Sequence, residues 1–147
     1  MTKDVLRFFF DYSAGGCLWA GDGATQSRLC VGPVDATVYD LEGRVRREPK
    51  IILSAATRQL RDWVDTVHSH YPNPHYQLDP SLWTQDACDS FNATVDRLLV
   101  LLLSELDGNF EILDQQSRYV EDPALGEYLV ANPEISAVKD ISGSMVR

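Results

Sequence analysis

Residues 5–12 read V-L-R-F-F-F-D-Y, and this stretch decides the fold class. Valine, phenylalanine and tyrosine favour strands, and three consecutive phenylalanines need cover on both faces of a sheet. We therefore expect a central β-strand here. The pair Gly15-Gly16 predicts a tight turn, after which residues 17–20 (C-L-W-A) form the partner strand of a hairpin.

A first long helix is expected to begin after Ser54, a good N-cap residue, and to end near His70. Its apolar side chains share one stripe at helical spacing: Ala56, Leu60, Trp63, Val64, Val67 and Tyr71. The opposite side, which we expect to face solvent, carries Arg58, Arg61, Asp62 and Asp65.

The longest helix is expected to begin after Thr84 and to end near Leu106. In its first half, an apolar stripe lies opposite three carboxylates, Asp86, Asp89 and Asp96. From Leu98 onward, apolar residues occur on every side of the helix. This pattern predicts that the second half is buried all round.

Shorter elements complete the expected fold. They are a helical turn at 24–29, a β-hairpin formed by 34–39 and 45–48 with a basic tip, a last strand at 110–113 and a weaker helix at 122–131. We therefore predict an α+β protein, with a small antiparallel sheet and two main helices packed on one face. Residues 1–131 would form a single domain, and residues 132–147 would form a loose C-terminal tail.

The charge of the chain is unevenly distributed. The net charge is −9 over 147 residues, and residues 76–147 hold thirteen acidic residues against four basic ones. A negative surface repels phosphate groups, so we expect neither nucleic acid nor an anionic membrane as a partner. It attracts a basic protein, although the same charge could serve solubility alone.

The chain also carries signs of its compartment. The N-terminus, M-T-K-D-V-L-R, places charged residues where a signal peptide needs an apolar stretch. No apolar run approaches the roughly 20 residues that span a bilayer. Three scattered cysteines, Cys17, Cys30 and Cys88, do not make a disulfide framework. We therefore expect a cytoplasmic protein with reduced thiols.

Candidate chemistry is sparse. His68 and His70 point about 200° apart on a helix, and no other pair of residues has zinc spacing, so we expect no metal and no cofactor. Cys17 beside Gly15-Gly16 is the only cysteine whose neighbours suggest a nucleophile, but two glycines also simply make a turn. Because spacing identifies no nucleophile, base and orienting group, we expect no catalysis.

Aromatic residues beside carboxylates give a candidate recognition surface. Aromatic anchors ringed by acidic groups suit a basic partner. The candidate residues are Trp19, Asp22, Asp79, Trp83, Asp86, Asp89 and Asp96. For Trp83, packing at the start of the long helix is the alternative, and both readings can hold if one edge of the ring stays exposed.

Four motifs resemble those of a group of short bacterial proteins. They are the opening F-D-Y-S-A-G-G-C-L-W (10–19), the helix start at Leu53-Ser54, the element D-P-S-L-W (79–83) and the element C-D-S-F-N (88–92). The likeness covers roughly two-thirds of the chain and fails at residues 36–50 and after Gln115. In size, acidity and layout this group is similar to immunity proteins, which neutralise polymorphic or contact-dependent bacterial toxins.

The resemblance implies a protein-binding function and assigns no catalytic residues. We expect an immunity protein that occludes the active site of a basic toxin domain. Two alternatives remain open at this point. One is a small cytoplasmic enzyme with a site near Cys17 and Asp22, and the other is a homo-oligomeric structural subunit.

Overall fold

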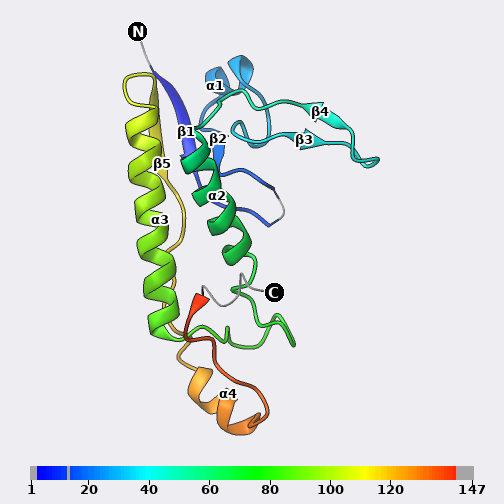
Figure 1. Cartoon of the computed structure of the whole chain (residues 1–147), viewed down its shortest axis with the longest axis vertical. Coiled ribbons are helices and arrows are strands. Elements are labelled where there is room, and N and C mark those ends of the chain that lie inside the picture. Colours follow the sequence, from blue (N-terminus) through cyan, green and yellow to red (C-terminus); the bar gives the residue numbers. More distant parts are fainter. Residues whose placement is uncertain (1–2, 13, 142–147) are drawn as a thin grey trace.

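The computed structural model describes residues 3–12 and 14–141, and the phenylalanine-rich strand lies at the centre of its main sheet (Figure 1). The elements follow in the order β1 (Asp4–Phe8), β2 (Leu18–Ala20), α1 (Gly23–Arg28), β3 (Val38–Tyr39), β4 (Val45–Arg47), α2 (Ala55–His68), α3 (Gln85–Glu105), β5 (Phe110–Asp114) and α4 (Leu125–Ala131). The predicted α+β class is confirmed.

The main sheet has the strand order β2-β1-β5. β1 pairs antiparallel with β2, with Leu6 opposite Ala20, as the hairpin prediction requires. β5 pairs parallel with β1, with Leu6 opposite Ile112, so the sheet is mixed rather than purely antiparallel. The parallel pairing arises because α3 carries the chain back to the end of the molecule where β1 starts (Figure 1).

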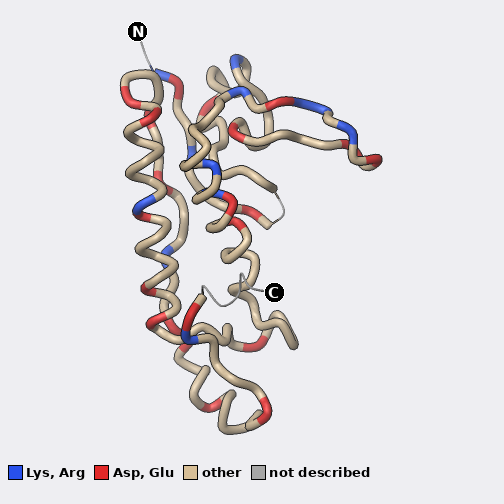
Figure 2. Tube along the Cα trace, in the orientation of Figure 1, with Lys and Arg blue, Asp and Glu red and all other residues tan. Residues whose placement is uncertain are grey.

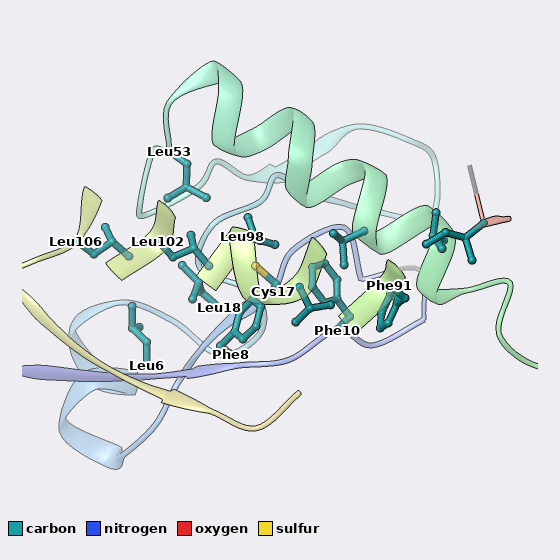
Figure 3. Close-up of a cluster of buried hydrophobic side chains, with 14 of the residues drawn as sticks. Leu6, Phe8, Phe10, Cys17, Leu18, Leu53, Phe91, Leu98, Leu102 and Leu106 are labelled. Atoms are coloured by element: carbon teal, nitrogen blue, oxygen red, sulfur yellow. The ribbon is translucent and has the colours of Figure 1, made fainter. Parts of the chain in front are cut away.

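The core lies between β1 and the two long helices. Leu6, Phe8 and Phe10 alternate along the chain and are buried in one cluster with side chains of α2 and α3, such as Leu98 and Leu102 (Figure 3). Phe9 faces the other side of the sheet, where it is half-buried and stacks on Trp19. The strand is therefore central, with deep burial on one face and partial cover on the other.

α2 begins after the predicted N-cap Ser54, whose side chain accepts a hydrogen bond from the Thr57 amide. The expected orientation of this helix is wrong at one position. Arg61, assigned to the solvent side, is only 7 % exposed. The helix turns Arg61 inward because its guanidinium pairs with the buried carboxylate of Asp35.

α3 begins after the predicted cap Thr84. Its second half is not buried all round, as had been expected, because Val100 is 64 % and Leu103 47 % exposed. The sheet and α2 pack against one side of the helix, and within the described residues no element covers the opposite side. The prediction of burial on all sides was therefore wrong, because this small fold does not have enough elements to cover every side of α3.

Residues 132–141, expected to be part of a loose tail, pack against the body of the protein. Val138 forms a parallel bridge with Trp83, donating its amide to the Leu82 carbonyl and accepting from the Thr84 amide. Ile141 is 2 % exposed. The backbone groups around Trp83 precede α3 and need partners, which this extended segment supplies. The rest of the predicted tail, 142–147, lies outside the described residues.

The hairpin of β3 and β4 stands away from the body of the molecule (Figure 1). At its base, Lys50 and Ile51 donate their amides to the Val34 carbonyl. Among the described residues, none of the helices is long and apolar enough to cross a membrane.

Candidate functional site

The predicted recognition residues fall into two groups in space. Asp86 and Asp89 are exposed on the first turns of α3, and Asp79 is half-buried in the preceding loop. Asp96 is also exposed, but its carboxylate forms an ion pair with Arg118, with an Nη2–Oδ1 distance of 2.8 Å. Three of the four carboxylates near α3 are therefore outside any ion pair that the structure shows.

Trp19 and Asp22 form the second group. The Trp19 ring donates its Nε1–H to the Phe9 carbonyl at 3.0 Å. The Asp22 carboxylate caps α1 by accepting from the Thr25 amide, and this hydrogen bond lowers the pKa of Asp22. α1 lies near one end of the molecule and the first turn of α3 near the other, so the two groups do not form one surface (Figure 1).

Trp83 packs at the start of the long helix, as the alternative given for it expected, but the exposed edge that a role as an anchor needs is absent. Its side chain is 1 % exposed and packs edge-on against Tyr71, with ring centroids 5.1 Å apart, and also against Phe91. The ring is buried because residues 136–141 pack beside it, which the sequence did not predict. Trp83 therefore supports the surface above it and cannot itself act as an exposed anchor.

Above Trp83 the surface is hollowed into a wide groove of about 1390 Å³. Residues 69–78 form one wall and residues 136–140 the other, and Tyr12 and Leu82 also line it. Two apolar side chains of the first wall are well exposed, Tyr76 at 57 % and Leu78 at 78 %. We call this feature the groove.

The wall formed by residues 69–78, together with the loop that follows it, is held in place by buried polar side chains. The Asn73 side-chain Oδ1 accepts from the His75 amide at 2.8 Å, and the Asn73 Nδ2 donates to the Pro80 carbonyl at 2.8 Å. The Ser81 hydroxyl donates to the Tyr71 carbonyl at 2.6 Å. A loop fixed in this way loses little conformational entropy when a partner binds.

The groove opens within an acidic part of the molecule. Residues 71–90 and 119–141, which we call the acidic end, carry eight carboxylates and one lysine, Lys139. In the tube view, acidic residues dominate the lower part of the chain, whereas most basic residues lie in the upper part, where acidic residues are interspersed with them (Figure 2). Apart from Asp140, no carboxylate of the acidic end takes part in an ion pair that the structure shows.

Cys17 lies in a different, fully buried cluster. Its thiol donates to Asp35 Oδ2 at 3.6 Å, and its amide donates to the same carboxylate at 3.1 Å. Burial raises the pKa of Cys17 well above its ordinary value of 9.0, and the charge of Asp35 raises it further. The Cys17 thiol therefore contacts Asp35, and a protonated, buried thiol is a poor nucleophile.

The three histidines occupy two environments. His68 is buried at the end of α2, whereas His70 and His75 are exposed and line the groove. Within residues 3–12 and 14–141, no group of three or more histidine, cysteine or acidic side chains could hold a metal ion.

The sequence did not indicate the apolar lip of the groove. Tyr76 and Leu78 lie in a proline-rich loop, where isolated apolar residues are common and carry no periodic pattern. The only signal was the pair of prolines Pro72 and Pro74, which predicts a stiff, extended segment.

Compared with family models, with curated proteins and with solved structures, the chain matches none.

Proposed function

We propose that this chain is a cytoplasmic, protein-binding inhibitor of the immunity type, which neutralises a bacterial toxin by covering the active site of a basic toxin domain. The observation that carries the proposal is the groove, with its exposed apolar lip, opening within the acidic end. Such a surface supplies both of the contributions that a tight inhibitor needs, apolar anchoring and charge attraction.

Apolar anchoring comes from the lip of the groove. Tyr76 and Leu78 are exposed on a loop that Asn73 and Ser81 hold in one conformation. Burial of a tyrosine and a leucine against a partner is a common source of binding energy, and a fixed loop avoids the cost of ordering. This lip is therefore the expected centre of the interface.

Charge attraction comes from the acidic end. Its carboxylates repel one another. The positive end of the α3 dipole offsets the charge of Asp86, and Asp89 accepts a hydrogen bond from the neutral Gln85 side chain. A partner that supplies arginine or lysine relieves this repulsion and associates faster by electrostatic steering. The basic active-site cleft of a nuclease-type toxin has this chemistry.

The experiment uses the product of the gene adjacent to that of this chain, which the proposal expects to be the toxin domain. The wild-type chain is expected to restore growth of cells that express that domain and to bind it in vitro. The double variant Tyr76→Ala/Leu78→Ala should weaken binding by about tenfold or more through faster dissociation. The double variant Asp86→Asn/Asp89→Asn should slow association and flatten its dependence on salt.

Matched controls exist elsewhere on the chain. Asp107→Asn/Glu111→Gln removes the same charge from exposed positions beyond the other end of α3, and Leu41→Ala removes an exposed apolar side chain from the hairpin. Both controls should bind as the wild type does. No neutralisation of the neighbouring toxin, or equal losses in variants and controls, contradicts the proposal.

A homo-oligomer is the second candidate, and the β3–β4 hairpin favours it. Tyr39, Leu41 and Val45 are more than half exposed on this projecting element. Light scattering coupled to size-exclusion chromatography measures whether the protein is a monomer or an oligomer. A dimer that Tyr39→Ser/Leu41→Ser converts to a monomer would support this candidate, and a monomeric wild type would exclude it.

A further inference from the structure

The parallel strands β1 and β5 separate at their carboxyl ends. The last backbone bond between the two segments runs from the Gln115 amide to the Phe8 carbonyl at 2.9 Å. One residue later, the Gln116 side chain replaces the backbone, and its Oε1 accepts from the Phe10 amide at 2.7 Å. A shallow pocket of about 360 Å³, largely open to solvent, lies here, and we call it the cavity. Its lining includes Arg7, Phe10, His68, Ser117 and Tyr119.

The position and size of this cavity suit a small molecule. In open sheets of parallel strands, ligands bind outside the carboxyl ends of strands, where the chains diverge and leave a crevice. The volume lies within the range of ligand sites in proteins. The cavity does not share a lining residue with the groove proposed for the protein partner.

Arg7 gives the cavity its charge. Unlike Arg28, Arg44, Arg61 and Arg118, it forms no ion pair within the described residues. Its Nε donates a long hydrogen bond of 3.4 Å to the Ala20 carbonyl, and its guanidinium lies 5.3 Å from the centre of the Phe9 ring. The two terminal nitrogens of Arg7 have no hydrogen-bond partner among the described residues, so these two nitrogens are available to an anion.

His68 supplies a second, independent observation. Its side chain is enclosed by the rings of Phe10, Tyr12, Phe91 and Tyr119, and the residue is only 5 % exposed. Its Nδ1 is buried with no hydrogen-bond partner among the described residues. Buried polar atoms normally have a partner, so an unsatisfied one in a cavity-lining residue points to a group that the protein does not provide.

We infer that this cavity binds a small oxyanion, a carboxylate or phosphate group, with Arg7 as the charged contact and His68, Ser117 and Tyr119 as polar contacts. Arginine is suited to such groups because its planar guanidinium donates two parallel hydrogen bonds. The Tyr119 hydroxyl remains protonated as a donor at neutral pH, since burial raises its pKa to about 12.

The test is a nuclear magnetic resonance titration of the full chain at neutral pH with inorganic phosphate and, separately, with acetate. We expect saturable shifts of the Phe10 and Ser117 amides and of the His68 ring. Arg7→Gln should weaken this binding by about tenfold or more, since a charge-assisted contact is lost. Ser117→Ala, at an exposed position that the fold does not need, should weaken it less.

Arg58→Gln is the matched control, because Arg58 is exposed, forms no ion pair that the structure shows and lies outside the cavity. Binding of phosphate alone identifies a phosphate ligand, binding of acetate alone a carboxylate, and either result supports the site. The absence of saturable shifts at the lining residues overturns it. So does an equal loss in Arg7→Gln and Arg58→Gln, which would show a non-specific effect of charge.

Discussion

Arg61 and Asp35 form a buried ion pair, with Arg61 Nη1 3.3 Å from Asp35 Oδ2. The Asp35 side chain is fully buried and also accepts the amides of Cys17 and Leu18. Burial lowers the pKa of Arg61, but the charges of Asp35 and Asp62 and the hydrogen bonds to them outweigh this effect and leave the pKa raised. The pair ties α2 to the segments before β2 and β3.

The first prediction concerns this pair. Asp35→Asn should lower the free energy of unfolding by about 3–5 kcal/mol, because it leaves the Arg61 charge buried without its main partner. Urea denaturation measures the change. Asp62→Asn is the control, since Asp62 contacts the same guanidinium from an exposed position and should cost less than about 1 kcal/mol. If both variants lower the free energy of unfolding equally, the buried contact contributes no more than the exposed one, which would contradict the prediction.

A second prediction follows from the space beside Asp35. A methyl group added at Gly16 would lie 2.6 Å from Asp35 Oδ1 and 2.8 Å from the Pro33 Cβ. Gly16→Ala should therefore destabilise the protein by about 1–3 kcal/mol. In contrast, Gly126→Ala meets open space within α4 and should stabilise by about 0.5–1 kcal/mol. Thermal denaturation compares the two, and a neutral Gly16→Ala would contradict the close approach.

The third prediction concerns pH. Burial lowers the pKa of His68 below its ordinary value of 6.5, and the charge of Asp11 opposes this only in part. Below about pH 6.5 the unfolded chain binds a proton at this histidine, whereas in the folded protein His68 stays neutral. The free energy of unfolding therefore decreases as the pH is lowered from about 6.5 to the lowered pKa of the folded state. Above pH 6.5 both states are neutral and His68 has no effect on pH dependence.

The comparison of wild type with His68→Phe isolates this effect, because the carboxylates titrate equally in both proteins. Unfolding free energies measured by urea from neutral pH downward should fall more steeply for the wild type between pH 6.5 and the lowered pKa. Parallel curves would show that His68 does not couple to folding.

A fourth prediction concerns the thiols. Burial raises the pKa of Cys17 well above 9.0 and that of Cys88 to about 11, whereas Cys30 is half-buried. In the native protein, alkylation by iodoacetamide should reach Cys30 first and modify Cys17 about a hundredfold more slowly, through opening of the fold. Mass spectrometry of the digested protein measures the order. Rapid modification of Cys17 would contradict its buried contact with Asp35.

Much of the candidate surface near α3 could be predicted, because helical spacing places Asp86 and Asp89 on an exposed face. The groove, which none of these carboxylates lines, could not be predicted. It depends on residues 136–140 lying opposite residues 69–78, and these segments are about sixty residues apart in the sequence. The same approach of distant segments buries Trp83, which sequence alone had left partly exposed.

The sequence by itself determined the elements whose signals are local. Ser54 and Thr84 cap their own helices, and the strand-forming residues of 5–12 give a central strand, whereas the structure shows which of its side chains face the core. Only the tertiary structure decided that Arg61 turns inward, that β5 runs parallel to β1 and that Val138 pairs with Trp83. Each of these depends on a buried carboxylate or an unpaired backbone group finding a partner far along the chain, and periodicity within one segment carries no information about that partner.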